Sequence, residues 1–320
     1  MVLFWADPVA PGGWSRLERS MTLAVHAVPR SALLVAIPSH RRAEKYLAGR
    51  RITAVGHERA LREMPDGIDL VVMDQKQPNE AAERIIKMGR ERSIPVFPIR
   101  DPGDPDWGAV AGCLGGWPPD GKSSSPPGPE WAILHPRFRH FNQVRRVYPR
   151  RARKVLLHLE ERLGYRELGD LIDPLWRRGY RVRVGPMASI RGNLKRALSA
   201  KYPGLRWVGA VECMARPLFE ADAALLIPGA AALEAAAVGT PALYLCPEEK
   251  ERRTAAQLER LGIGLVAESP EDVLSRLDRD TLRGRGTAGK LLIDGRGLFR
   301  TLDFLRLQGF LHQRRNGTES

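Results

Sequence analysis

The sequence has few cysteines, and none of them is placed to hold a metal or a disulfide framework. The 320-residue chain contains three, Cys113, Cys213 and Cys246, which are far apart and form no C-x-x-C. Structural zinc sites and disulfide-rich folds need closely spaced or paired cysteines. We therefore expect no metal and no other cofactor, and isolated thiols in odd number favour a reducing cytoplasm.

We expect no secretory signal at the start of this sequence, which also contains no uninterrupted apolar run of membrane length. Its first residues, MVLFWADPVAPGG, contain no basic segment followed by an apolar one. The most apolar stretch, 221–246, is interrupted by two prolines, two glycines and Glu234. We therefore expect no transmembrane segment, and we predict a buried strand, a helix and a second buried strand in this stretch.

Acidic residues are fewer than basic residues. The chain has 37 Asp and Glu against 51 Lys and Arg, a net charge of +14, which favours anionic partners such as nucleotide phosphates, acidic glycans or other polyanions. The run 137–154 holds eight of these basic residues and no acidic one, with aromatic residues between them, a pattern that can bind single-stranded nucleic acid. Because arginine is abundant throughout the chain, we interpret the run as a solvated interdomain segment and do not expect nucleic acid as a partner.

Apolar strand candidates alternate with amphipathic helical segments in both halves of the chain, which is typical of parallel α/β sheets. We predict a Rossmann-like N-terminal domain over 1–136, with a Pro/Gly/Ser-rich loop at 101–130. The basic segment 137–154 then leads into a Rossmann-like C-terminal domain over 155–320. Within it, 297–313 has leucines at helical spacing and is predicted to be a helix that can return to the N-terminal half.

A near-match to a phosphate-binding loop occurs at 284–291, GRGTAGKL. Leu291 stands where the motif G-x-x-x-x-G-K-[ST] needs a hydroxyl. The preceding residues, 270–282, read as a polar helix, whereas a phosphate loop follows a buried strand. A nucleotide site is therefore expected elsewhere.

Two other segments could present a helix N-terminus to an anion. In 12–27, Ser15 and Glu18 fit a capping box, which predicts a helix from Arg16 with Arg16 and Arg19 near its positive end. The alternative is an ordinary capped helix with solvated arginines.

The second segment is 225–246, read as strand, turn at Pro228–Gly229, helix and strand. The turn directs the helix N-terminus out of the carboxyl edge of the sheet, where open α/β folds bind ligands. Glu234 is the one charge in this helix and is suited to hydrogen-bond a ribose, the alternative being an exposed surface glutamate.

Several stretches together resemble a known family. They are GPEWAILHPRFR (128–139), YRVRVGP (180–186), the run 212–245, LERLG (258–262) and LLIDGRGLFR (291–300). They are similar to the UDP-sugar hydrolases of pseudaminic acid biosynthesis and to spore-coat polysaccharide proteins, relatives of the MurG-type glycosyltransferases. The resemblance implies the glycosyltransferase-B fold, two Rossmann-like domains facing a cleft, with a UDP-type nucleotide sugar held mainly by the C-terminal domain.

The resemblance also implies roles for individual residues of the N-terminal half. Gly13 and Arg19 match the family's N-terminal loop, but Arg16 stands where the family has a histidine thought to act on the attacking water. A guanidinium remains protonated and cannot be a general base. Arg16 and Asp74, which matches a family aspartate, are the catalytic candidates, and His26 and His40 are candidates for a base that lie away from any motif.

In the C-terminal half, Gly229, Ala230 and Glu234 match the family's nucleotide-sugar-binding turn and ribose contact. The implied function is a nucleotide-sugar hydrolase or glycosyltransferase of surface-polysaccharide, spore-coat or flagellin-glycan biosynthesis, with hydrolysis by the family's mechanism slow or absent. The alternative is a non-catalytic relative that binds a nucleotide sugar, a glycan or a partner protein.

Overall fold

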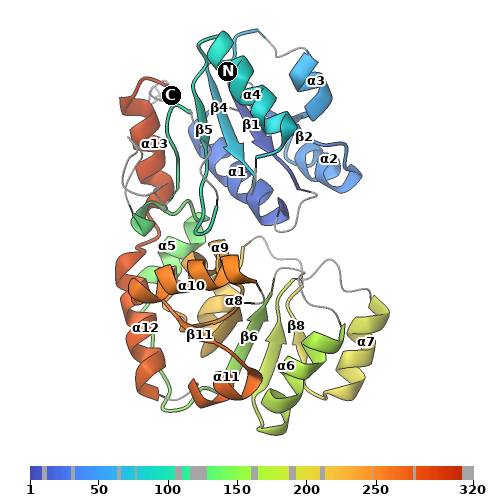
Figure 1. Cartoon of the computed structure of the whole chain (residues 1–320), viewed down its shortest axis with the longest axis vertical. Helices are drawn as coiled ribbons and strands as arrows, with labels where there is room; N and C mark the ends of the chain where they lie inside the picture. Colours follow the sequence, from blue (N-terminus) through green and yellow to red (C-terminus); the bar gives the residue numbers. More distant parts are fainter. Residues whose placement is uncertain are drawn as a thin grey trace, which may run out of the picture. The chain divides into compact units, whose positions relative to one another are not determined.

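The computed structural model divides the chain into two compact units (Figure 1). The first comprises Met1–Arg100, Asp104–Ile133 and Arg296–Ser320, and the second comprises Asp101–Gly103 and Leu134–Gly295. The structure describes residues 1–8, 13–29, 33–62, 66–75, 78–104, 110–115, 128–159, 165–186, 192–209, 213–246, 248–276 and 279–311.

The first unit is built on a five-stranded parallel sheet in the order β3-β2-β1-β4-β5. Its central strands β1 and β4 are buried on both faces and apolar except for Asp74 at the end of β4, as expected for a parallel sheet covered by helices. The strands are β1 (Val2–Ala6), β2 (Leu33–Ile37), β3 (Thr53–Gly56), β4 (Leu70–Asp74) and β5 (Val96–Pro98).

Helices cover both faces of this sheet. One core joins Val2 and Phe4 of β1 to the helices α1, α2 and α13, and the other joins Leu3 and Trp5 to α3 and α4. The helical elements are α1 (Gly13–Ala27), α2 (Arg41–Ala48), α3 (His57–Arg62), α4 (Glu80–Glu91), the 3-10 turn η2 (Pro129–Trp131) and α13 (Gly297–Leu307).

The last helix of the chain, α13, belongs to the first unit. Its apolar face, Leu298, Leu302 and Leu305, lies in the same core as Leu17 of α1. The helix predicted in 297–313 is thus present, ending at Leu307. Its place in the first unit agrees with the expectation that it returns to the N-terminal half, although the predicted domain 155–320 contained it, because these leucines are buried against the first sheet.

The second unit is built on a six-stranded parallel sheet in the order β11-β10-β9-β6-β7-β8. Its strands are β6 (Lys154–His158), β7 (Arg181–Val184), β8 (Arg206–Trp207), β9 (Ala223–Leu226), β10 (Ala242–Leu245) and β11 (Leu265–Ala267). Its helices are α5 (Pro136–Gln143), α6 (Tyr165–Arg177), α7 (Gly192–Lys201), α8 (Ala215–Glu220), α9 (Ala230–Ala237), α10 (Glu249–Arg260), α11 (Pro270–Arg276) and α12 (Arg279–Leu292).

The basic run 137–154 is part of the second unit, and several of its side chains cap helix ends. Asn142 donates to the carbonyl oxygen of Ala237 at 2.8 Å, and the Tyr148 hydroxyl donates to that of Gly239 at 2.9 Å. Arg146 donates to the carbonyl oxygen of Phe219 at 2.9 Å. These bonds satisfy carbonyls that the C-termini of α8 and α9 leave open.

The near-match to a phosphate loop, 284–291, lies inside α12. Its glycines allow α12 to approach the alanine-rich α9, since a Cβ on Gly289 would lie 2.9 Å from the Cβ of Ala236. A Cβ on Gly286 would lie 2.6 Å from the carbonyl oxygen of Gly239. The glycine spacing therefore serves helix packing, which confirms that this segment is not a phosphate loop.

The apolar stretch 221–246 forms β9, α9 and β10, as predicted. No helix in the described part of the chain is long and apolar enough to cross a membrane.

Candidate functional site

Each sheet has a topological switch point, where the strand order reverses direction. On one side of this point the chain adds strands in one direction, and on the other side it adds them in the opposite direction. In the first sheet this point lies between β1 and β4, and in the second between β6 and β9. Open α/β sheets bind ligands outside the carboxyl ends of the strands at such switch points. The residues that end these four strands are therefore the first to examine.

At the first switch point, Asp74 ends β4 opposite Ala6 of β1. It is fully buried and accepts hydrogen bonds from Arg19, whose Nε lies 2.9 Å and Nη2 2.5 Å from the carboxylate. Ser20 Oγ donates to it at 3.2 Å, and Arg16 Nη1 lies 3.4 Å away. The structure thus brings together three of the predicted residues, Arg16, Arg19 and Asp74.

Arg16 has a second acidic partner that the sequence analysis did not identify. Its Nη2 lies 3.0 and 3.1 Å from the two carboxylate oxygens of Asp104. Both side chains are buried, so the two guanidinium groups of Arg16 and Arg19 are balanced by the two carboxylates of Asp74 and Asp104. The guanidinium groups that were expected to bind an anion are therefore already paired with carboxylates of the protein.

The predicted start of α1 is wrong. The helix begins at Gly13 rather than at Arg16, and Ser15 is exposed inside its first turn. Ser15 is therefore not the N-cap, and Glu18 Oε1 accepts a hydrogen bond from Trp14 Nε1 at 3.0 Å. Arg16 therefore sits on the buried face of the helix, one turn inside it.

Gly13 has a steric role at the beginning of α1. A Cβ at this position would lie 1.9 Å from the carbonyl oxygen of Asp7, which no real side chain tolerates. Glycine is thus required for α1 to start close to the end of β1.

The two remote base candidates have local structural roles. His26 Nδ1 lies 2.7 Å from the carbonyl oxygen of Thr22 within α1. His40 is the N-cap of α2 and accepts from the backbone N–H of Ala43 at 3.3 Å. Neither hydrogen-bonds with the Asp74 network in the contacts described.

At the second switch point the chain passes from β9 through Pro228 and Gly229 into α9. Gly229 is the N-cap of α9 and provides no capping side chain, so the first turn of the helix presents backbone N–H groups. Gly229 and Ala230 are half-buried, whereas most of the helix is buried in the core. Backbone N–H groups at the N-terminus of a helix favour negative charge in general.

Glu234 is the one charged residue of α9, and it lies one turn after Ala230. Its side chain is half-buried, in contrast to the fully buried alanines beside it, and it is already engaged in an interaction of the fold. The structure thus places Gly229, Ala230 and Glu234 along one turn of helix at the carboxyl edge of the second sheet.

His158, which the sequence analysis did not single out, ends β6 at the same switch point. It lies in register with Leu226, the last residue of β9, and is half-buried. The signal in the sequence was the polar residue closing the apolar strand KVLLH. Residues 160–164, which follow this strand, lie outside the described part of the chain.

The described residues contain no group of three or more His, Cys, Asp or Glu side chains that could hold a metal ion. Cys113 is buried, and Cys213 and Cys246 are half-buried free thiols.

The fold is shared with solved structures, although no family model and no curated protein matches the sequence. MurG of Acinetobacter baumannii is 14% identical with a TM-score of 0.65, covering 96% of this chain and 99% of that one. A putative UDP-N-acetylglucosamine 2-epimerase from Listeria monocytogenes is 10% identical with a TM-score of 0.66, covering 96% of both chains. MnaA of S. aureus, solved with UDP, is 11% identical with a TM-score of 0.63, covering 98% of both chains.

These similarities define the fold class as glycosyltransferase-B, with two parallel-sheet α/β domains, as predicted. At 10 to 14% identity they show the fold alone. Membership of the UDP-sugar hydrolase family and the cleft between the domains stay predictions.

Proposed function

We propose that the chain binds a nucleotide sugar, of the UDP type, through its second unit, in a glycosyltransferase-like role. The observation that carries the proposal is the passage from β9 into α9 at the switch point of the second sheet. The solved structure of MnaA, which shares this fold, contains UDP. The charge of +14 suits an anionic ligand of this kind.

In this proposal the backbone N–H groups at Gly229 and Ala230 bind the diphosphate, which the positive end of the α9 dipole also favours. Glu234, one turn further on, accepts hydrogen bonds from the ribose hydroxyls. His158 closes β6 on the other side of the switch point and donates to the phosphate.

Transfer suits the structure better than hydrolysis by the family's histidine mechanism. Arg16 cannot accept a proton, and Asp74 already accepts hydrogen bonds from Arg19 and Ser20. Binding without catalysis is the second candidate function, and the same network favours it, because it engages both predicted catalytic residues. Surface-polysaccharide, spore-coat or flagellin-glycan biosynthesis, with an acidic glycan as a further partner, is the biological setting proposed from the sequence resemblance.

Isothermal titration calorimetry with UDP and UDP-N-acetylglucosamine tests the nucleotide site. We expect Glu234→Gln to weaken UDP binding by about tenfold or more, since a hydrogen bond to a charged group contributes about 1.5–3 kcal/mol. Glu91→Gln, an exposed carboxylate at the end of α4, is the matched control and should leave the affinity unchanged. The unfolding temperatures of the free proteins verify that Glu234→Gln is folded.

A thermal-shift comparison of UDP, CMP and GDP sugars extends the same test, because a bound ligand stabilises the native state by mass action. Stabilisation by UDP sugars would support the proposal. The proposal fails if no nucleotide sugar gives heat or a thermal shift, or if Glu234→Gln binds UDP as tightly as the native protein.

A further inference from the structure

A basic and apolar surface lies on the second unit, where the segment 143–151 runs along α12. Lys290 of α12 donates a hydrogen bond to the carbonyl oxygen of Val144. Further along the segment, Tyr148 hydrogen-bonds with Thr287 and lies close to Arg283, one turn earlier in the helix. The segment and the helix therefore contribute to one continuous surface.

The charged side chains that this surface presents are arginines. The segment 143–151, QVRRVYPRR, contains four arginines and no acidic residue. Arg146 is half-buried and binds carbonyl oxygens at the end of α8. The exposed arginines of the segment and of the adjoining face of α12 are Arg145, Arg150, Arg151 and Arg283. Within the described part of the chain, these four guanidinium groups form no ion pair and no hydrogen bond.

The acidic residues beside this surface do not balance the four arginines. Asp222 already accepts hydrogen bonds from two backbone N–H groups, at 2.8 and 2.9 Å. Asp294, after the end of α12, is engaged in an interaction of the fold. Asp280 is exposed in the first turn of α12, one turn before Arg283, and adds a single negative charge. The surface therefore remains positive and favours an anionic partner.

Apolar side chains are exposed among these arginines. Val147 is 81% exposed and Leu291 is 80% exposed. Arg283, Thr287 and Leu291 are four residues apart and share one face of α12. Tyr148, which follows Val147, contacts this same face. Aliphatic side chains exposed together with unpaired cations are typical of a surface that lies on a lipid bilayer.

The phenylalanine and tyrosine rings of the basic run are not available to stack on nucleic-acid bases. Phe138 is buried, and Phe141 packs on Phe219 with the ring centroids 5.0 Å apart. The hydroxyl of Tyr148 is bonded to the carbonyl oxygen of Gly239. Binding of single-stranded nucleic acid depends on aromatic rings that can stack on bases. The exposed side chains are aliphatic and cationic instead, which favours an anionic lipid surface over RNA.

We propose that the surface formed by 143–151 and α12 binds the headgroups of a bilayer that contains anionic lipids. Its arginines bind lipid phosphates, and Val147 and Leu291 enter the boundary between the headgroups and the acyl chains. The surface uses none of the residues assigned to the nucleotide site, so the two proposals can be tested separately.

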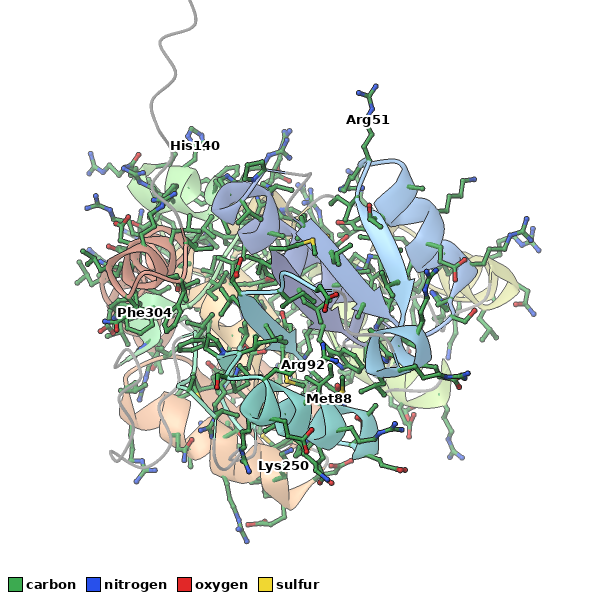
Figure 2. All side chains as sticks on the ribbon, turned by 90° about the horizontal axis from the view of Figure 1, so that it is seen from above. Arg51, Met88, Arg92, His140, Lys250 and Phe304 are labelled. Atoms are coloured by element: carbon green, nitrogen blue, oxygen red, sulfur yellow. The ribbon has the colours of Figure 1, made fainter. Side chains whose placement is uncertain are left out.

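Sedimentation with vesicles of phosphatidylcholine mixed with phosphatidylglycerol tests the charged part of this surface. Vesicles of phosphatidylcholine alone are the uncharged comparison and should bind far more weakly. Arg145→Gln and Arg150→Gln should each weaken binding to the anionic vesicles about fivefold, the contribution of one basic residue near an anionic surface. Arg51→Gln is the matched control and should leave binding unchanged, because Arg51 projects outward from the turn before β3 in the first unit (Figure 2).

Two further variants test the apolar part of the surface. Val147→Asn and Leu291→Gln leave the net charge unchanged. Each should weaken binding to the anionic vesicles about fivefold or more, because a polar side chain gains nothing from entering the bilayer. Both positions are exposed, so the unfolding temperatures of these variants should be close to that of the native protein.

Competition with a single-stranded oligouridine separates a lipid surface from a nucleic-acid site. An excess of the oligouridine should leave the protein on the anionic vesicles. Displacement from the vesicles would assign the arginines to nucleic acid and overturn the inference.

The inference is also overturned if the anionic vesicles do not bind the protein, or if Arg51→Gln weakens binding as much as Arg145→Gln. Native affinity of both Val147→Asn and Leu291→Gln for the vesicles would overturn it as well, because attraction by the positive charge alone would then explain the binding.

Discussion

Arg16 on α1 and Asp104, 88 residues further along the chain, form a buried ion pair in which one guanidinium nitrogen contacts both carboxylate oxygens. The side chains are 9% and 3% exposed. Since the same guanidinium also reaches Asp74 at 3.4 Å, the pair connects α1, the end of β4 and the segment that follows β5. Arg16 is therefore a structural residue of the first unit.

Replacing Arg16 by methionine should strongly destabilise the protein. Breaking a buried pair leaves its partner as an uncompensated charge, which costs about 3–5 kcal/mol. Urea unfolding of Arg16→Met should show a loss of this size. Arg62→Met, which breaks the exposed pair with Glu58, is the control and should cost less than about 1 kcal/mol.

The double variant Arg16→Met/Asp104→Leu separates the ion pair from general packing. Removing both charges leaves no isolated Asp104 carboxylate, so its loss of stability should be smaller than the sum of the two single losses. Simple additivity of the two losses would show that Arg16 and Asp104 are not coupled.

Release of UDP from UDP sugars should be absent or slow in the native protein. A general base contributes about 10² to 10⁴ in rate, and Arg16 stands where the family's histidine is expected. Steady-state assays with several UDP sugars, on the native protein, Arg16→His and Arg16→Ala, measure this. Turnover by the native protein that Arg16→Ala leaves intact would show that another residue is the base.

The helices and strands that could be predicted are those whose formation is determined by the residues of the segment itself. Uninterrupted apolar runs such as that of β4 predict buried parallel strands, and the prolines and glycines of 221–246 predict two strands around α9. The central strand β1 is not among the predicted strands, because its short apolar run at the start of the sequence carries no turn or helix signal before it. Its five residues are all buried between the strands β2 and β4 and the helices on both faces of the sheet.

The residues of the candidate sites could be predicted only in part. Gly229, Ala230 and Glu234 lie on one continuous stretch of chain, so the sequence indicated their proximity. The partner of Arg16 could not be read in the same way, because Asp104 reaches it from a distant segment. The basic run could be recognised, but its contact with α12 could not, because the two segments are far apart in the chain.

Two glycines of α12 should respond in opposite directions to alanine. Gly284 has nothing within 4 Å of an added Cβ, so Gly284→Ala should gain about 0.5–1 kcal/mol from helix propensity. At Gly289 the added Cβ would lie 2.9 Å from the Cβ and 3.0 Å from the Cα of Ala236. Overpacking of this kind costs about 1–3 kcal/mol, so Gly289→Ala should destabilise the protein in urea unfolding. Equal effects of the two substitutions would contradict the close packing of α12 on α9.

His57, the first residue of α3, should make the stability of the protein depend on pH in weakly acidic solution. Burial lowers its pKa in the folded state, whereas in the unfolded chain the pKa is about 6.5. As the pH falls below about 6.5 the unfolded chain takes up a proton that folded His57 resists, so the free energy of unfolding decreases. One such group contributes a slope of at most about 1.4 kcal/mol per pH unit.

Urea unfolding of the native protein and of His57→Phe, from pH 8.5 to pH 5, measures this contribution. Phenylalanine cannot take up a proton, so the stability of the variant should fall less steeply below about pH 6.5. Above about pH 7.5, where His57 is neutral in the folded and the unfolded chain, the two slopes should coincide even though their absolute stabilities differ. Parallel curves over the whole range would mean that folded His57 takes up a proton as readily as the unfolded chain.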